Sequence, residues 1–229
     1  MEYLKHDSPV STQIRLFQRE PLDVAKALLG KVLAVRHDNF WLMARIIETE
    51  AYYRQEKASH SSLGFTKKRE ALFMSPGTIY MYYSRGGDSL NFSCEGDGNA
   101  VLIKSAFPIA KKEGGLQDIL TMQNNNPNRD GSTRGLNNLC SGQTLLCKSL
   151  GLKVPDWDGK QLESECFELW DDSYAPIEII QTTRLGIRQD RDAHLPYRFI
   201  DMNFVRYCTK NPLSVRNFQI GRDYTILTP

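Results

Sequence analysis

The chain has 229 residues, of which 41% are apolar, so it can form one substantial hydrophobic core or at most two small ones. Its net charge of +2 excludes a uniformly basic polycation, and binding of nucleic acid would require basic residues gathered on one face. Five widely spaced cysteines without a CxxC pair argue against a disulfide framework or a zinc site.

The N-terminal third predicts a helix followed by two strands. Residues Pro21 to Leu29 have a proline suited to a first helical turn and leucines at helical spacing. Lys31 to Arg36 and Phe40 to Thr49 read as strands around a polar turn. Residues 54–68 are polar and predict a loop, and Arg69 to Met74 predicts a short helix.

The middle of the chain predicts a hairpin and a further strand. Thr78 to Tyr83 and Leu90 to Ser93 are β-prone segments on either side of the turn sequence SRGGD. Ala100 to Ser105 is a strongly apolar strand. Residues 108–123 read as a helix, and residues 124–138 as a flexible loop.

The C-terminal part predicts one more helix and three strands. Ser141 is a candidate N-cap for a helix over Gly142 to Leu150, which Gly151 can end. The predicted strands are Phe167 to Trp170, Ile177 to Ile187 and Tyr197 to Ile200. Because the order lacks a βαβ rhythm, we expect one α+β domain over residues 1–229, built on an antiparallel sheet with flanking helices. Within it, residues 1–13 are expected to be flexible.

Two carboxylates follow an apolar run in the segment RIIETEAY, Arg45 to Tyr52. Residues two apart in a strand share a face, so Glu48 and Glu50 should point the same way. One of them could act as a general base on water, with its pKa raised by an apolar environment. Alternatively, both are solvated at a strand end, and the spacing alone favours that interpretation.

Aromatic residues after this segment indicate a possible binding pocket. Tyr52, His60, Tyr80 and Tyr82 could sandwich a flat ring such as a nucleobase extruded from DNA. The alternative is that the tyrosines are core residues and that His60 is a loop histidine. Tyr80 and Tyr82 share a strand face, so Tyr83 should point to the opposite side.

The hairpin turn and the basic residues each allow two interpretations. The turn Ser84 to Asp88 could be a wedge that fills the gap left by an extruded base, or simply a hairpin turn. The basic residues could form a phosphate track on a common face, or be ordinary surface charge. They are Lys67, Lys68, Arg69, Lys104, Lys111, Lys112, Arg184, Arg188, Arg191 and Arg198.

Taken in order, the motifs RIIETEAY, ASHS, FMSPGTIYMYY, LNFSCEGDGNAVLIK, LCSG, TTRLGI and PYRF resemble the alkyladenine DNA glycosylase family. The resemblance covers roughly residues 14–205. It implies a single domain with a curved antiparallel sheet and a protruding hairpin. It also implies hydrolysis of the N-glycosidic bond of damaged purines in duplex DNA, without a metal or organic cofactor.

The resemblance also implies roles for individual residues. Glu50 matches the glutamate that activates water, and Asn91 matches the asparagine that excludes guanine by crowding its amine. The residues that match the holders of the flipped base are Tyr52, His60 and Tyr82, with Tyr80 as a neighbouring aromatic on the same strand. Arg184 is expected at the DNA backbone. No lysine matches a Schiff-base nucleophile, so we expect a monofunctional enzyme.

Three positions depart from the family pattern. Lys104 stands where many members have an arginine that helps to hold the catalytic water, and it keeps the charge but not the planar fork. The hairpin is about one residue shorter than usual, so the wedge is either Tyr83 or Arg85. The usual SGPxKL reads SGQTLL from Ser141 to Leu146, which removes a basic contact to DNA.

Two alternative functions remain open from the sequence. One is a catalytically impaired module of the same fold that binds damaged DNA, and a more remote one is a hydrolase of free nucleosides. The N-terminus lacks the apolar core of a signal peptide, and no apolar run is long enough to span a membrane. We therefore expect an intracellular monomer, in the cytoplasm and nucleoid of a bacterium or the nucleus of a eukaryote.

Overall fold

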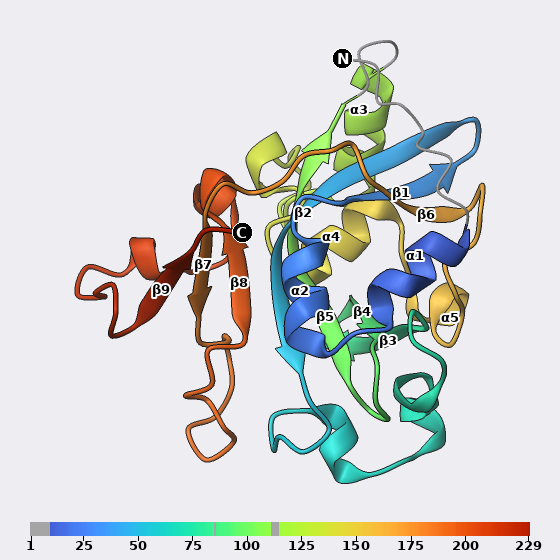
Figure 1. Ribbon diagram of the computed structural model, residues 1–229. Coiled ribbons are helices and arrows are strands. Elements are labelled where there is room, and N and C mark those ends of the chain that lie inside the picture. The colour runs from blue at the N-terminus through green and yellow to red at the C-terminus, as the bar shows by residue number, and fades with distance from the viewer. Residues whose placement is uncertain (1–9, 85, 111–114) are drawn as a thin grey trace.

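The computed structural model describes residues 10–84, 86–110 and 115–229 (Figure 1). Residues 1–9, part of the N-terminal segment expected to be flexible, lie outside this range. Arg85, a candidate wedge, and Lys111 and Lys112, two candidate phosphate contacts, also lie outside the described residues.

One antiparallel sheet forms the centre of the fold. Its strands within the described ranges are β1 (Val32–His37), β2 (Phe40–Tyr52), β3 (Ile79–Ser84), β4 (Gly87–Ser93), β5 (Ala100–Ile109), β6 (Phe167–Trp170), β7 (Ile179–Thr182), β8 (Arg198–Asp201) and β9 (Tyr224–Leu227). The main order is β3-β4-β5-β2-β8-β7-β9, and β1 pairs with β2 and β6. The paired strands are antiparallel, which confirms the predicted α+β class.

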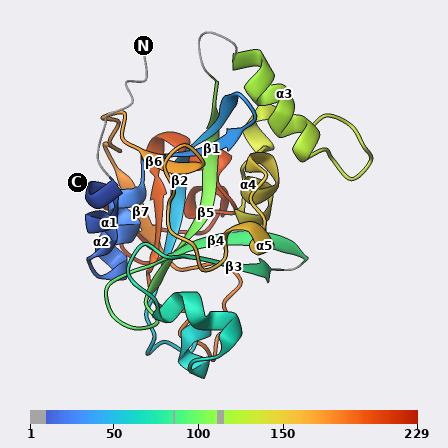
Figure 2. The same cartoon turned by 90° about the vertical axis from the view of Figure 1, so that its right-hand side faces the viewer.

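Helices lie on both sides of the central strands. The α-helices are α1 (Val10–Phe17), α2 (Pro21–Leu28), α3 (Gly115–Asn125), α4 (Gln143–Leu150) and α5 (Val154–Trp157). Shorter 3₁₀ helices are η1 (His60–Leu63), η2 (Lys67–Phe73), η3 (Leu136–Asn138), η4 (Met202–Tyr207) and η5 (Pro212–Ser214). Figure 2 shows α1 and α2 on one side of β2 and β5, with α3 and α4 on the other. In the part of the chain that the structure describes, no helix is long and apolar enough to cross a membrane.

Strand β2 is buried along almost its whole length. All of its residues from Trp41 to Ala51 are buried, as is typical of a strand covered on both faces. One edge of β2 pairs with β5, and the other edge pairs first with β1 and then, from Glu48 to Glu50, with β8. The strand therefore carries both carboxylates of RIIETEAY into the interior of the protein.

A bulge interrupts the β2–β5 ladder just before Glu50. The register shifts between Ile46 and Glu48 and again between Glu48 and Thr49. Bulges bend a strand, increase its twist and occur often beside functional sites. This one contributes to the curvature of the sheet around the residues that follow.

The main hydrophobic core joins the helices to the sheet. Phe17 of α1 stacks on Phe92 of β4 with ring centroids 4.9 Å apart, and Trp157 of α5 meets the edge of Phe167 at 5.2 Å. Leu28 of α2 and Leu146 of α4 are fully buried in the same cluster. This packing fixes the positions of the strands that carry the candidate site residues.

Most predicted elements are present with shifted ends, but two predictions are wrong. The segment from residue 108 begins in β5 and not in a helix, because Phe107, Pro108 and Ile109 pair with β2 residues; α3 starts only at Gly115. Ser141 is not the N-cap of α4. Gly142 occupies that position with a φ of 107°, a conformation that favours glycine.

The segments predicted as loops over 54–68 and 124–138 contain the short helices η1 and η3, and other segments differ in length. The strand predicted from Phe40 continues to Tyr52, whereas the strand predicted over Ile177 to Ile187 is shortened to β7. Helix α1, helix α5 and strand β9 were not predicted. Gly151 ends α4 in the left-handed conformation, with a φ of 69°, as predicted.

Candidate active site

One residue from each of five neighbouring strands lies in a single row across the sheet, directly opposite the residue of the next strand. Tyr80 of β3 is opposite Asn91 of β4, and Asn91 is opposite Leu102 of β5. Leu102 is opposite Glu50 of β2, which is opposite Arg198 of β8. Directly opposed residues in antiparallel strands lie on the same face. The sheet register therefore gathers residues that are up to 148 positions apart in the sequence (198 minus 50).

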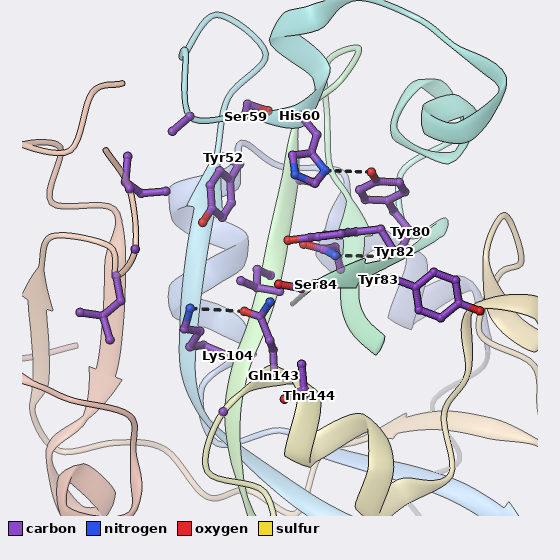
Figure 3. A pocket seen from close by; sticks show the side chains of 18 of the residues that line it. Tyr52, Ser59, His60, Tyr80, Tyr82, Tyr83, Ser84, Lys104, Gln143 and Thr144 are labelled. Carbon is purple, nitrogen blue, oxygen red and sulfur yellow. Dashed lines mark hydrogen bonds between the residues drawn. The ribbon is translucent and has the colours of Figure 1, made fainter. Parts of the chain in front are cut away.

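A cavity of about 660 Å³ opens over this face of the sheet. Its lining comprises Tyr52, Ala58, Ser59, His60, Leu72, Tyr80, Tyr82, Tyr83, Ser84, Asn91, Ala100, Leu102, Lys104, Gly142, Gln143, Thr144, Leu185, Gly186, Ile187, Arg191 and Thr209. Figure 3 shows the Tyr52 ring on one side of this space and the rings of His60 and Tyr82 on the other. The lining is aromatic on two sides, which suits a flat ligand.

Glu50 lies directly behind the cavity wall. Its side chain is completely buried, and three residues that line the cavity contact its carboxylate. The Tyr52 hydroxyl donates to Oε2 at 2.7 Å, the Leu185 amide donates to Oε1 at 3.3 Å, and Lys104 Nζ lies 3.3 Å from Oε1. Ligands in the cavity are therefore separated from Glu50 only by these groups.

The charges around Glu50 keep it ionised. Burial alone raises the pKa of a carboxyl group, but the positive charges of Lys104 and Arg198 oppose that effect at Glu50. Hydrogen bonds from Tyr52 and Leu185 act in the same direction as the two cations, and the net result is a lowered pKa. The expectation that an apolar environment raises the pKa of the general base is therefore wrong for Glu50. Glu50 is thus a carboxylate at neutral pH, as a proton acceptor must be.

Lys104 bridges Glu50 and the start of α4. Its ammonium group donates to Oε1 of Gln143 at 3.3 Å (Figure 3). It also forms the ion pair with Glu50. Only 13% of its side chain is exposed. A lysine offers a point charge without the planar fork of arginine, and Gln143 supplies a second anchor that fixes this charge in place.

His60, Tyr80 and Tyr82 form a connected aromatic wall. The His60 and Tyr82 ring centroids are 4.3 Å apart, and Tyr80 stacks on Tyr82 at 5.5 Å. His60 Nδ1 lies 3.0 Å from the Tyr80 hydroxyl. The shared face predicted for Tyr80 and Tyr82 is confirmed by this stacking.

The aromatic wall carries no charge at neutral pH. Although part of the His60 ring faces the open cavity, burial of the rest lowers its pKa, and the nearby charges of Arg69 and Arg191 lower it further. Burial raises the pKa values of the Tyr80 and Tyr82 hydroxyls. The wall therefore presents neutral, polarisable faces to a ligand.

Asn91 is fixed at the floor of the cavity between these walls. It is 5% exposed, and its Nδ2 donates to the carbonyl oxygen of Tyr80 at 3.0 Å. This hydrogen bond holds the amide plane and leaves little freedom for the side chain to rotate away. A group attached to a ligand edge at this point would meet a rigid obstacle.

The β3–β4 hairpin forms one rim of the cavity. Tyr83 is 64% exposed there, and its ring points away from the other aromatic residues of the lining (Figure 3). Gly87 seats the hairpin against α4, because a Cβ at this position would lie 2.8 Å from both Cβ and Cγ2 of Thr144. The close approach fixes the direction in which Tyr83 projects.

Arg184 lies in the interior, although it was expected at the DNA backbone. Only 1% of its side chain is exposed; it forms an ion pair with Glu56, and its Nη1 donates to the Ala51 carbonyl at 2.7 Å. Its guanidinium lies over the Tyr52 ring, 4.5 Å from the centroid. Arg184 is absent from the cavity lining, so it supports Tyr52 from outside the cavity.

Glu48 and Glu50 have distinct environments despite sharing a strand face. Glu48 is completely buried and accepts hydrogen bonds from Arg198, Ser105 and Thr209. It does not line the cavity. The prediction that the carboxylates are solvated at a strand end is therefore wrong for both residues.

Sequence patterns did not single out several site groups. Leu185 contributes its backbone amide, which no side-chain pattern can indicate. Gln143 belongs to the SGQTLL segment and anchors Lys104, and Thr209 lines the cavity from beyond the recognised motifs. Within the described residues, no group of three or more His, Cys, Asp or Glu is arranged to hold a metal ion.

Comparison with known protein families gives a match over most of the chain. The sequence model for the methylpurine-DNA glycosylases matches residues 15–203, which span most of the chain and include the cavity residues up to Arg191. The chain belongs to the methylpurine-DNA glycosylase family. It is accordingly a DNA glycosylase, a hydrolase of DNA repair, and the resemblance seen in the motifs is confirmed.

Individual relatives agree with this family. A protein of Pseudomonas syringae pv. tomato is 55% identical over 220 residues, covering 96% of this chain and 98% of the relative. A Pseudomonas aeruginosa protein is 54% identical over 92% of this chain and 88% of its own length. A Francisella tularensis subsp. tularensis protein is 32% identical over 80% of this chain and 91% of its own length. All three bear the name "Putative 3-methyladenine DNA glycosylase".

Proposed function

We propose that this methylpurine-DNA glycosylase removes alkylated purines, including 3-methyladenine, from duplex DNA by hydrolysis with a water that Glu50 activates. The observation that carries the proposal is the position of Glu50. Its ionised carboxylate lies immediately behind a cavity whose aromatic walls suit a purine. The names of the relatives support 3-methyladenine as a substrate.

The damaged nucleotide first leaves the helix and enters the cavity. Unstacking a base costs a few kcal/mol and costs least for a weakened pair, which favours damaged nucleotides. Tyr83 on the hairpin rim is the candidate that fills the gap in the stack, since it is the exposed aromatic residue at this rim in the described part of the hairpin. Exposed basic residues hold the phosphates on either side.

The purine is held between Tyr52 and the wall of His60 and Tyr82. An alkylated purine carries a positive charge, which electron-rich aromatic faces attract through cation–π contacts. Because the wall is itself neutral at physiological pH, it does not repel that charge. Asn91 excludes guanine, whose exocyclic amine would collide with the fixed amide.

Hydrolysis then takes place beside Glu50. A water molecule attacks C1′ of the sugar, Glu50 accepts its proton, and the electron pair of the N-glycosidic bond leaves with the base. The negative charge of Glu50 also stabilises the positive charge that develops on the sugar. Lys104, held by Gln143, positions the carboxylate and the water, and the reaction leaves an abasic site without cutting the strand.

The experiment is a release assay on duplexes that carry a single lesion. Incubation with duplexes containing 3-methyladenine or hypoxanthine should yield the free base and an alkali-labile abasic site, with an intact duplex as control. Activity should fall steeply as salt increases, because phosphate binding releases counterions. Lesion binding without base release would indicate a binding module. Cleavage of free nucleosides in preference to duplexes would indicate a nucleoside hydrolase.

A further inference from the structure

The second carboxylate of RIIETEAY is the centre of a buried polar network. Arg198 donates to Oε1 of Glu48 from Nε at 2.7 Å, and Thr209 Oγ1 donates to the same oxygen at 2.7 Å. Oε2 accepts from Ser105 Oγ at 2.5 Å and from the Thr209 amide at 3.1 Å. We call this set of four residues the Glu48 network: Glu48, Ser105, Arg198 and Thr209. Both oxygens of Glu48 thus accept hydrogen bonds from protein donors, and the residue does not line the cavity.

The Glu48 network reaches Glu50 by two routes. In the first, Arg198 is directly opposite Glu50 in the β2–β8 register, and its charge favours the ionised form of Glu50. Glu48 fixes the guanidinium there, since the ion pair is 2.6 Å long and the Arg198 side chain is only 2% exposed. A buried arginine without this partner would carry an uncompensated charge.

The second route passes through the start of α4. Ser105 Oγ donates to Glu48 and accepts a hydrogen bond from the Gly142 amide at 3.0 Å. Gly142 is the N-cap of α4, and the next residue, Gln143, anchors Lys104. The position of Glu48 is thereby transmitted to the ammonium group that pairs with Glu50.

We propose that Glu48 is a positioning residue for base release, acting on Glu50 through Arg198 and through Ser105. This inference rests on the proposed function, in which Glu50 is the general base. It gives the two carboxylates complementary roles. Glu50 accepts the proton of water, and Glu48 fixes the positive charges of Arg198 and Lys104 beside Glu50. An ion pair with a purely structural role would stabilise the fold without influencing the pH dependence of the reaction.

The sign of the expected pH effect follows from the charges around Glu50. The groups that act on its pKa are Lys104, Arg198, the Tyr52 hydroxyl and the Leu185 amide. Glu48 pairs with Arg198, and the charge of Glu50 is felt by Tyr82 of β3. Loss of the Glu48 charge leaves that of Arg198 uncompensated, so the positive potential at Glu50 increases and its pKa falls. The low-pH limit of activity should then move to lower pH.

The test is single-turnover base release from a 3-methyladenine duplex as a function of pH, at saturating enzyme. For Glu48→Gln we expect the acidic limb to move down by about one pH unit and the maximal rate to fall roughly 10-fold because the groups are less well fixed. Ser105→Ala keeps every charge, so it should lower the maximal rate without moving the limb. Lesion binding should change little in both variants.

Asp172→Asn provides the matched control. Asp172 pairs with Arg45 at 2.6 Å, its side chain is 12% exposed, and neither residue lines the cavity. This variant should lose stability but keep the wild-type acidic limb and rate when it is assayed below its unfolding temperature. Urea unfolding of all variants separates effects on the fold from effects on the reaction.

The outcomes separate this inference from the proposed function. If Glu48→Gln keeps the acidic limb and the maximal rate of the wild-type protein, or if its acidic limb moves to higher pH, the positioning role is overturned. The proposed base-release activity is not affected by either result. If Glu48→Gln does not fold, Ser105→Ala decides, and a wild-type maximal rate in that variant overturns the inference. Absence of base release by the wild-type protein would instead refute the proposed function.

Discussion

The Tyr52 hydroxyl donates a 2.7 Å hydrogen bond to Oε2 of Glu50, two residues earlier on the same strand. One side chain thus forms a wall of the cavity and also holds the buried carboxylate behind it. In the proposed mechanism, this contact couples recognition of the base to activation of water. A ligand that moves the Tyr52 ring also moves a partner of Glu50.

Replacing Tyr52 with phenylalanine tests this coupling. The hydrogen bond favours ionised Glu50, so its loss raises the pKa of Glu50. A higher pKa means that Glu50 becomes protonated at a higher pH. The acidic limb of the activity profile should therefore move to higher pH by about one unit. The measurement is the pH profile of single-turnover base release. Tyr53→Phe is the control, since its hydroxyl donates to Glu20 at 3.2 Å outside the cavity; a limb that moves equally in both variants contradicts the prediction.

The His60 ring should be neutral at pH 7. Burial lowers its pKa from the ordinary value of 6.5, and Arg69 and Arg191 contribute repulsion in the same direction. Titration followed by NMR of the ring nitrogens should therefore place its midpoint below pH 6.5. Arg191→Gln removes one repelling charge and should move the midpoint upward. A midpoint above 6.5 in the wild-type protein would mean that a cation faces the bound purine.

Because Arg184 is buried, its replacement should change the stability of the protein and not its contacts with DNA. Arg184→Gln leaves Glu56 buried without its partner and removes the support of the Tyr52 ring, so stability should fall by about 3–5 kcal/mol. The salt dependence of DNA binding should stay unchanged, because no phosphate contact is lost. Loss of a phosphate contact would reduce the slope of log affinity against log salt by about one.

Arg188→Gln is the control for that measurement. Arg188 is 77% exposed and pairs with Asp190 at the surface, so its loss should cost little stability. Unfolding in urea and binding at several salt concentrations, applied to both variants, compare a buried and an exposed arginine. A reduced salt slope in Arg184→Gln with unchanged stability would restore Arg184 as a contact to the DNA backbone.

The contact between the hairpin and α4 predicts the effect of an added methyl group. Gly87→Ala places a Cβ 2.8 Å from Thr144 Cβ, so the hairpin or the helix start must shift. We expect a loss of about 1–3 kcal/mol in unfolding free energy. Gly135→Ala is the control, since a Cβ there meets nothing within 4 Å. Equal stability of the two variants would show that the hairpin is not held by this contact.

The sequence predicted the elements whose patterns are local. The apolar run before Glu50 indicated a strand, and Pro21 and Gly151 marked the ends of helices that the structure contains. Pairing across the sheet could not be predicted in the same way. Pro108 and Ile109 lie in a strand because β2 provides partners for them, and that long-range pairing overrides their local pattern.

The candidate site was likewise predictable where local sequence patterns determine it, and not where long-range contacts do. Residue order indicated Glu50, Tyr52, His60 and Tyr82, and these lie around one cavity or directly behind it. The separation of Glu48 from Glu50 depends on donors from β5 and β8 and from residue 209, none of which is near in sequence. Charge alone also suggested that Arg184 is a surface residue, whereas its contacts with Glu56 and the Tyr52 ring hold it inside.

The measurement that tests the proposed mechanism most directly is base release by Glu50→Gln. The amide keeps the size of the side chain but cannot accept the proton of water, so the single-turnover rate on a 3-methyladenine duplex should fall roughly 100- to 10,000-fold. Binding to the same duplex should persist, because Glu50 does not line the cavity. Release at the wild-type rate by a folded Glu50→Gln protein would contradict the assignment of Glu50 as the general base.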